Sequence, residues 1–323
     1  MITTLLAIAA ILIAVAIALP FVMVLWPWNA APDPLEGLEF DVVNHMQAEP
    51  LSTETQAMRD GYPMVLRRLD GPEGGPLVVM IHGSAWNGMP LESLGRRVAQ
   101  YADVLIPDLR GHGAAPGRRG DVDYIGQLED DLADLISAQA EPGQEVILLG
   151  YSSGGGLVVR FAGGPHGDLM DRAVLIAPFL QHDAPTTRTE SGGWALPNVK
   201  RIIGLTLLDA AGIRAFNSYP VLRFAMPKAV LEGRYGHMAT PEYSFRLNAS
   251  FAPRRDWKAD ITHLPPFLLI AGTNDEAFHS EAYEPTMTPL NANGTYRMVP
   301  DKTHLEIPDA PETAEAVVGF VRG

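Results

Sequence analysis

Short apolar runs separated by turn residues recur along the chain from residue 63 almost to its end. Most are continuous stretches of valine, isoleucine and leucine, a pattern typical of parallel strands buried on both faces. The predicted strands are PMVLRRL (63–69), LVVMI (77–81), DVLIP (103–107), EVILL (145–149), AVLIA (173–177), FLLIA (267–271) and TYRMV (295–299). Because the turn-rich stretch DGPEGGP joins the first two runs, we expect those two strands to pair as a hairpin.

Amphipathic segments alternate with these runs. Apolar residues recur at helical spacing in YIGQLEDDLADLISAQA (124–140), and further helices are predicted in PLESLGRRVAQYA, SGGGLVVRFAG and APETAEAVVGFVRG. Strand–helix alternation favours right-handed crossovers, so we expect an α/β fold with a doubly wound, mostly parallel sheet.

One connection is too long for a single crossover helix. The 87 residues between Pro178 and Pro266 are about three times what such a crossover needs. They contain several apolar and aromatic stretches, so the sequence predicts a mostly helical cap, or lid, over residues 179–265. This cap would interrupt a core made of residues 61–178 and 266–323.

The N-terminus carries the longest apolar run. Residues 5–26, LLAIAAILIAVAIALPFVMVLW, contain no charged residue. As a helix they would span about 33 Å, enough for a hydrocarbon core of about 30 Å. Trp26 and Trp28 stand where interfacial aromatic residues belong, and Pro20 is tolerated in a membrane helix. We therefore predict a single-pass transmembrane anchor at residues 1–28, followed by a tether and lead-in at residues 29–60.

A cleaved signal peptide is the competing interpretation of this run. Residues 1–4 lack the basic residues of a signal peptide, and WNAAPDP is a poor cleavage site, so we favour an uncleaved anchor. No Lys or Arg follows the run before Arg59, whereas a cytoplasmic flank usually carries them. This asymmetry favours a catalytic domain outside the cytoplasm.

Composition excludes several classes of function. The chain carries 38 acidic and 24 basic residues, a net charge of −14, which argues against nucleic-acid partners and against overall attraction to anionic membranes. It contains no cysteine, which excludes disulfides, zinc–thiolate sites, iron–sulfur clusters and a cysteine nucleophile.

The candidate chemistry begins at the junction of EVILL and the helix after it. Gly150-Tyr151-Ser152-Ser153-Gly154 fits G-x-S-x-G, the pattern of a nucleophile on a sharp strand-to-helix turn. Such a turn needs small residues two positions before and after the nucleophile. Ser152 meets this requirement, whereas Ser153 has Tyr151 two positions before it. Ser152 is therefore the candidate nucleophile, and the backbone N–H of Ser153 is a candidate oxyanion donor.

An acid and a histidine follow at later strand ends, in the order that this pattern requires. Asp275 lies just beyond FLLIA in a glycine-containing turn, and His304 lies just beyond TYRMV. Both lie at carboxyl ends of strands, where open α/β sheets build their sites. Glu276 and Asp301 are the competing acids, and we prefer Asp275 to both.

The stretch IHGSAW supplies the remaining candidates. It ends a predicted strand and opens a loop from which the backbone N–H of Ser84 would be a second oxyanion donor. We expect His82 to hold this loop by hydrogen bonds rather than to act as a base. Trp86 and Tyr151 are candidate substrate-pocket residues, although Trp86 could equally belong to the core.

Together these features resemble the α/β-hydrolase superfamily from about Gly61 to the C-terminus. The stretch DLRGHGAAPG (108–117) is similar to the D-x-R-G-H-G-x-S-x-G stretch of the monoacylglycerol lipase, lysophospholipase and serine aminopeptidase-like branch, with Ala115 in place of the usual serine. In that family the stretch is structural. The resemblance implies the triad Ser152, Asp275 and His304, and the oxyanion donors Ser84 and Ser153.

We therefore expect a serine hydrolase that cleaves carboxylic esters through an acyl-enzyme and needs no metal or cofactor. Apolar residues in the predicted cap favour lipophilic small-molecule esters, such as monoacylglycerols, lysophospholipids or similar acyl esters, although these residues could simply pack the cap. A serine aminopeptidase is one alternative, with thin support from the scattered acidic residues of the cap. A non-catalytic binding protein on the same fold is another, but such proteins usually lose a triad residue.

Overall fold

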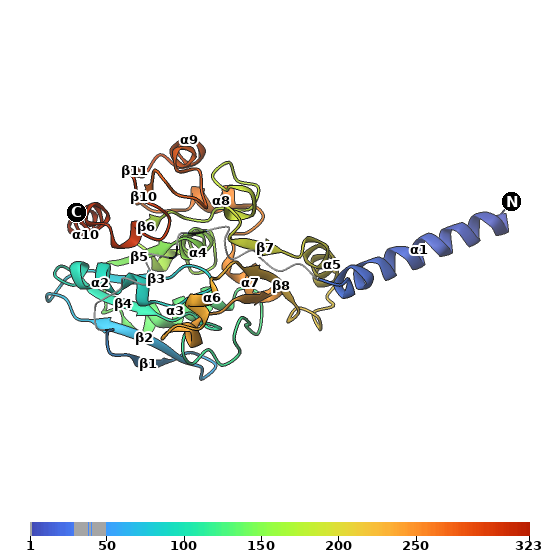
Figure 1. Ribbon diagram of the computed structural model, residues 1–323, viewed down its shortest axis with the longest axis horizontal. Helices are drawn as coiled ribbons and strands as arrows, with labels where there is room; N and C mark the ends of the chain where they lie inside the picture. Colours follow the sequence, from blue (N-terminus) through green and yellow to red (C-terminus); the bar gives the residue numbers. More distant parts are fainter. Residues whose placement is uncertain (1, 29–37, 39, 41–49) are drawn as a thin grey trace.

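The computed structural model describes residues 2–28, 38, 40 and 50–323, apart from the side chain of Glu190 (Figure 1). Residues 29–37, 39 and 41–49 of the predicted tether lie outside the described residues. An eight-stranded sheet forms the centre of the molecule, with the order β1-β2-β4-β3-β5-β6-β10-β11. Its strands are β1 (Glu54–Ala57), β2 (Pro63–Leu69), β3 (Leu77–Ile81), β4 (Asp103–Pro107), β5 (Val146–Tyr151), β6 (Arg172–Ile176), β10 (Phe267–Gly272) and β11 (Gly294–Val299).

The six neighbouring strands β4-β3-β5-β6-β10-β11 pair in parallel, as the continuous apolar runs predict. Every residue of β3, β5 and β10 is buried, because helices cover the sheet. One pair of helices in contact is α2 (Glu92–Val98) with α10 (Pro311–Arg322). A second group consists of α3 (Gln127–Gln139), α4 (Ser153–Ala162) and α8 (Trp257–Thr262). The helix α9 (Tyr283–Met287) lies between β10 and β11 in the chain.

The predicted hairpin between the first two apolar runs is wrong. β2 pairs with β1 and β4, and β3 lies on the far side of β4, where its two edges are taken by the parallel strands β4 and β5. The segment between β2 and β3 instead passes close to Ala102, just before β4 begins. A Cβ at Gly71 would lie 2.2 Å from the carbonyl carbon of Ala102, so glycine is needed there because two backbone segments cross closely.

The residues between β6 and β10 form an insertion between two neighbouring parallel strands. Besides helices, this insertion contains a three-stranded antiparallel sheet of order β7-β8-β9 that the expectation of a mostly helical cap missed. Its elements are β7 (Ala195–Pro197), α5 (Val199–Ala210), β8 (Pro220–Phe224), α6 (Lys228–Leu231), β9 (Glu242–Ser244) and α7 (Phe245–Phe251), followed by α8. The strands are too short to show a period in the sequence.

Ion pairs around the buried carboxylate of Glu129 attach the insertion to the helices of the core. Glu129 on α3 accepts from Arg160 on α4 at 2.5 Å and from Arg254 of the insertion at 2.7 Å. Arg160 also donates to the backbone carbonyl of Ala249 on α7 at 2.9 Å. Because removing one partner of such a pair leaves an uncompensated buried charge, loss of Glu129 or Arg160 would be costly.

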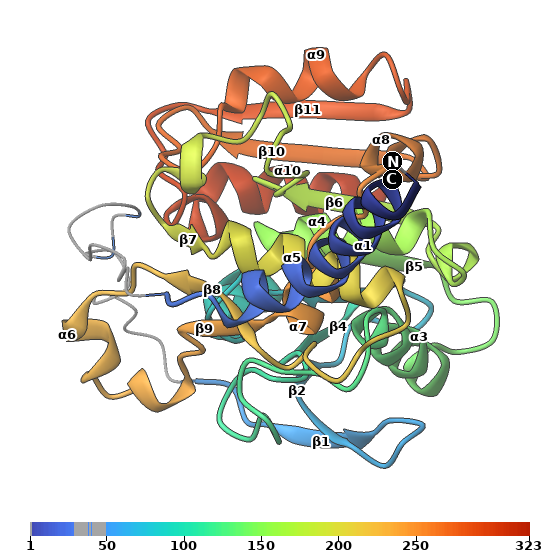
Figure 2. The same ribbon diagram turned by 90° about the vertical axis from the view of Figure 1, so that its right-hand side faces the viewer.

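The N-terminal helix α1 (Ile2–Leu25) projects away from the rest of the molecule (Figure 1). Its length and composition are sufficient to cross a membrane, a property that a signal sequence shares. Only its last turns contact the remainder of the described structure, by packing on α5 (Figure 2).

Candidate active site

The turn between β5 and α4 holds Ser152 in a strained conformation, with φ 55° and ψ −120°. A Cβ at Gly150 would lie 2.3 Å from the carbonyl oxygen of Gly154. A Cβ at Gly154 would lie 2.3 Å from the carbonyl oxygen of Ile81 at the end of β3. Both contacts forbid a side chain, which is the steric reason for glycine two positions before and after the serine.

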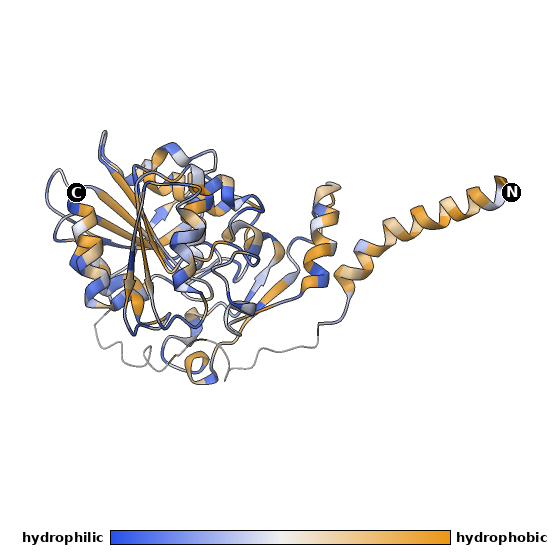
Figure 3. Cartoon of the chain, turned by 90° about the horizontal axis from the view of Figure 1, so that it is seen from above, coloured by the Kyte–Doolittle hydropathy of each residue, from blue (hydrophilic) through white to orange (hydrophobic). Residues whose placement is uncertain are grey.

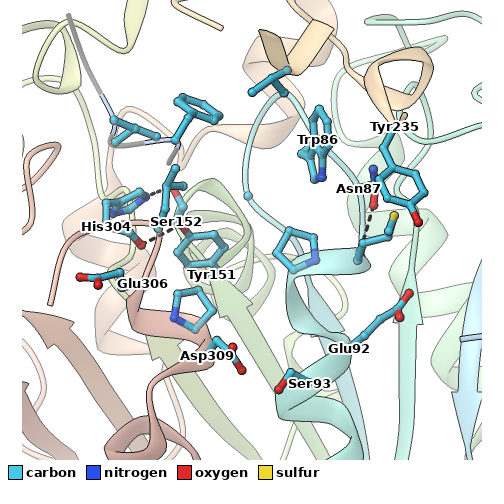
Figure 4. A pocket seen from close by; sticks show the side chains of 18 of the residues that line it. Trp86, Asn87, Glu92, Ser93, Tyr151, Ser152, Tyr235, His304, Glu306 and Asp309 are labelled. Atoms are coloured by element: carbon cyan, nitrogen blue, oxygen red, sulfur yellow. Dashed lines mark hydrogen bonds between the residues drawn. The ribbon is translucent and has the colours of Figure 1, made fainter. Parts of the chain in front are cut away.

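The structure brings Ser152, His304 and Asp275 together from the ends of three strands. The Oγ atom of Ser152 lies 3.0 Å from Nε2 of His304, and Nδ1 of His304 lies 2.8 Å from Oδ2 of Asp275. All three side chains are buried. Figure 4 shows the first of these contacts at the floor of a cavity. This is the geometry of a nucleophile, a base and an orienting acid.

The neighbouring carboxylates have different positions. The second oxygen of Asp275 accepts from the backbone N–H groups of Ala277 and Phe278, at 2.9 and 2.8 Å, which fixes the carboxylate plane. Glu276 instead accepts from the backbone N–H of His304 at 2.8 Å. Asp301, the third candidate acid, is exposed on a turn. Asp275 is thus the carboxylate that contacts the imidazole ring.

Two aromatic rings confine the imidazole of His304. Tyr151 stacks on it at 5.2 Å and donates its hydroxyl hydrogen to the His304 carbonyl oxygen, and Phe278 meets it edge-on. Burial opposes protonation of the imidazole. The charge of Asp275, its hydrogen bond and the charge of Glu276 outweigh burial, so the pKa of His304 is raised above its usual value.

The predicted oxyanion donors lie on either side of Ser152. Ser153 is the first residue of α4, so its N–H has no acceptor within the helix. A Cβ at Gly83 would lie 3.1 Å from Cβ of Ser152, so the loop that carries Ser84 runs directly against the turn. The Ser84 hydroxyl accepts from the indole N–H of Trp194 at 3.2 Å. Within the described part of the chain, neither amide N–H donates to another residue.

Tyr243, on β9 of the insertion, supports this loop, and no sequence motif pointed to it. Its hydroxyl oxygen accepts from the backbone N–H of Ala85 at 2.6 Å and contacts Nε2 of His112 at 2.5 Å. Because Nδ1 of His112 faces the Arg110 carbonyl at 3.1 Å, that nitrogen carries the proton and Nε2 accepts from the tyrosine. The RGHG stretch therefore acts through Tyr243 on the residue next to Ser84.

His82 has the structural role that the sequence predicted. Its Nδ1 lies 2.7 Å from the Gly83 carbonyl oxygen, and its Nε2 accepts from the backbone N–H of Leu109 at 3.1 Å. Burial lowers the pKa of His82 to about 4, which keeps the ring neutral at physiological pH. Both ring nitrogens of His82 are thus engaged with the backbone of this loop and of Leu109.

A cavity of about 820 Å³ opens above Ser152 and His304. Trp86 and Tyr151, the predicted pocket residues, both line it (Figure 4). The insertion contributes Trp194, Met226 and Val230, which give much of one wall an apolar character. Charged side chains reach the same cavity and include Glu92, Arg234, Lys302, Glu306 and Asp309. Among the residues that the structure describes, no group of three or more His, Asp or Glu is arranged to hold a metal ion.

Comparison with known proteins agrees with this architecture. Residues 78–318 match the profile of the alpha/beta hydrolase family. An uncharacterized protein of Mycobacterium tuberculosis is 31% identical over 103 residues, which are 32% of this chain and 29% of that protein. An uncharacterized protein of Mycobacterium bovis matches to the same extent. The chain therefore spans less than a third of the length of the curated relatives that it matches.

Solved structures share the fold at low sequence identity. An esterase from Rhodococcus is 19% identical with a TM-score of 0.57, and the alignment covers 84% of this chain and 99% of that one. A monoacylglycerol lipase from Paleococcus ferrophilus is 20% identical with a TM-score of 0.56, covering 80% and 98%. A membrane phospholipase A described as a bacterial virulence factor is 16% identical with a TM-score of 0.57, covering 100% and 98%.

The Tyr243 contacts generate a test of stability. Tyr243→Phe leaves the Ala85 N–H and Nε2 of His112 buried without partners, so we expect the free energy of unfolding to fall by roughly 2–4 kcal/mol. Chemical denaturation measures the change. Tyr101→Phe is the matched control, because its hydroxyl has no hydrogen bond within the described structure, and it should cost at most about 0.5 kcal/mol. Equal losses in the two variants would contradict the proposed support of the loop.

Proposed function

The chain belongs to the α/β-hydrolase family, and we propose that it is a serine-dependent carboxylester hydrolase that acts on lipophilic esters. The observation that carries the proposal is the continuous contact from Ser152 through His304 to Asp275, at 3.0 and 2.8 Å. A serine in this position also disfavours the dehalogenase and epoxide-hydrolase chemistries of similar folds, which use an aspartate at the turn.

In the proposed first step, His304 takes the proton of the Ser152 hydroxyl while Oγ attacks the ester carbonyl. Asp275 holds the imidazole in the tautomer that has its proton on Nδ1 and stabilises the imidazolium that forms. The tetrahedral oxyanion accepts hydrogen bonds from the N–H groups of Ser84 and Ser153. Each such donor is typically worth about 3–4 kcal/mol in the transition state.

Collapse of the tetrahedral intermediate expels the alcohol, which takes the proton from His304 as it leaves. Water then attacks the acyl-Ser152 ester, with His304 acting as base a second time, and the carboxylic acid departs. His304 takes up and returns every proton that moves in the two steps, so the proposed reaction needs no metal or cofactor.

The cavity favours lipophilic substrates. Apolar and aromatic walls next to Ser152 suit an acyl chain or an apolar alcohol group, and the volume of about 820 Å³ is in the range of ordinary small-molecule sites. Esters resembling monoacylglycerols or lysophospholipids fit this description. The esterase, monoacylglycerol lipase and membrane phospholipase A folds named above support the same class by analogy.

We further propose that α1 is a membrane anchor and that the catalytic part lies outside the cytoplasm. The likeness to the membrane phospholipase A structure extends over the whole chain, α1 included. An anchor would keep the cavity near membrane lipids and raise their local concentration.

The aminopeptidase alternative needs a cluster of carboxylates in the cap to hold a substrate amine. Asp209, Glu232 and Glu242, acidic residues of the predicted cap, do not line the cavity, and the carboxylates that do, Glu92, Glu306 and Asp309, belong to the core. Glu242 is paired with Arg223, and Glu232 with Lys228. We therefore keep the ester hydrolase as the function that the geometry supports best.

Substrate profiling tests the proposed class. The full-length protein in detergent should hydrolyse p-nitrophenyl esters, with kcat/KM rising from short to longer acyl chains because the cavity walls are apolar. Ser152→Ala is the control for contaminating esterases and should lower kcat roughly 10⁴-fold or more. Hydrolysis of aminoacyl amides without hydrolysis of any ester would overturn the proposal in favour of the peptidase.

The pH profile tests the base. Activity requires neutral His304, so kcat/KM should fall as pH falls through its raised pKa, with a midpoint above the ordinary value of 6.5. Asp275→Asn removes the largest favourable influence on the imidazolium, so the midpoint should move to lower pH and kcat should fall about 10⁴-fold. Glu276→Gln keeps an acceptor for the His304 N–H and should move the midpoint less. An unchanged midpoint in Asp275→Asn would contradict these roles.

A further inference from the structure

We propose that one face of the cap helix α5 (Val199–Ala210) rests in the lipid headgroup and acyl boundary, as a second membrane contact beside α1. The surface consists of Val199, Ile203 and Leu207 and is called here the α5 face. The proposal rests on the anchor proposed above, because it takes α1 to cross the bilayer.

The α5 face is a continuous apolar stripe. Its three side chains follow one another at intervals of four residues, so they lie on one side of the helix. They are 56%, 44% and 49% exposed, respectively. The opposite side of α5 is already buried, since Leu205 and Leu208 pack in one cluster with residues of α1, β8 and α7. The exposed side chains therefore do not contribute to the buried cluster that packs α5 into the cap.

The α5 face continues the apolar surface of α1. Gly204 on α5 allows α1 to pack closely, because a Cβ there would lie 2.7 Å from the carbonyl oxygen of Pro20 and 3.0 Å from Cβ of Met23. Arg201 donates to the carbonyl oxygen of Val24 at 2.9 Å. The turn at which α1 would leave the bilayer is thus held against α5. Figures 2 and 3 show α5 lying across the base of α1, so α5 would run along the surface of a bilayer that α1 crosses.

Aromatic and basic groups gather where the two helices meet. The ammonium group of Lys200 lies 4.0 Å from the centre of the Trp26 ring, and the guanidinium group of Arg223 lies 4.1 Å from that of Trp28. Tryptophan favours the membrane interface, and long basic side chains place their charge among lipid phosphates. This local cluster complements anionic headgroups although the whole chain carries a net charge of −14.

These observations favour a lipid surface over a second copy of the chain as the occupant. The aromatic and basic groups match the headgroup layer, and the uncovered length of α1 sets the depth of the membrane beside them. The contact also bears on substrate entry. α5 connects β7 to β8, and Trp194 and Met226, which flank these two strands, line the catalytic cavity. A cap seated on the bilayer would hold that cavity near membrane-borne esters.

The cysteine-free sequence allows a direct test. Single cysteines are introduced by Ile203→Cys in the α5 face, Leu12→Cys in α1 and Glu141→Cys at an exposed turn of the core, and each is labelled with an environment-sensitive fluorophore. The full-length protein is reconstituted at a high lipid-to-protein ratio into phosphatidylcholine–phosphatidylglycerol vesicles that contain doxyl-labelled lipid. We expect severalfold stronger quenching at positions 203 and 12 than at position 141.

Quenching at position 12 but not at position 203 would overturn the α5 contact and leave the anchor intact. No quenching at position 12 would instead overturn the anchor and the inference that rests on it. A third outcome also overturns the proposal. The fluorophore at position 203 could report an apolar environment without being quenched by the doxyl lipid, and that signal could disappear when more lipid dilutes the protein. This result would identify a second copy of the chain as the occupant.

A functional measurement separates the contact from the catalytic site. The double variant Ile203→Ser/Leu207→Ser should hydrolyse a soluble short-chain ester at the wild-type rate but lose severalfold activity on a vesicle-borne ester. Leu231→Ser on α6, another exposed apolar site in the cap, is the control and should leave both rates unchanged. Equal activity of the double variant and the control on the vesicle-borne ester would contradict the inference.

Discussion

The strained turn at Ser152 is the constraint on which the rest of the site depends. A positive φ at this serine is tolerated only because Gly150 and Gly154 let the backbone of β5, α4 and β3 meet without side chains. The same close packing brings the loop after β3 against Ser152. The glycine contacts therefore position both the candidate nucleophile and the backbone amides around it. The parallel order of β6, β10 and β11 then places Asp275 and His304 at the same edge of the sheet.

The parallel core and the predicted triad could be read from the sequence because each depends on local patterns. Strands buried on both faces are continuous apolar runs, and the glycines around Ser152 report a steric requirement within five residues. The partners Asp275 and His304 follow from the rule that sites lie at the carboxyl ends of strands. No long-range packing had to be known to nominate them.

Where long-range packing decides the outcome, the sequence was misleading or silent. The turn composition before β3 predicted a hairpin, but β4 takes the position beside β3, and the glycine serves a crossing near Ala102. The short strands β7 to β9 are stabilised by one another and by the core rather than by their own pattern. The role of Tyr243 depends on contacts with residues more than 130 positions away, which no local motif encodes.

The insertion contacts the cavity, the loop at Ser84 and the N-terminal helix. It supplies an apolar wall of the cavity, supports the loop at Ser84 through Tyr243, and receives the end of α1 on α5. The proposed hydrolase is therefore a core whose chemistry is built on the β5–α4 turn and whose access to substrate is governed by one inserted unit. Such a division would let the proposed lipid contact of the cap change without altering the turn that carries Ser152.

Covalent labelling with a fluorophosphonate, followed by mass-spectrometric mapping of the modified residue, tests whether Ser152 is the nucleophile. We predict a single adduct on Ser152, resolved from Ser153 by fragmentation, and no labelling of Ser152→Ala. An adduct on another residue, or undiminished labelling of Ser152→Ala, would contradict it.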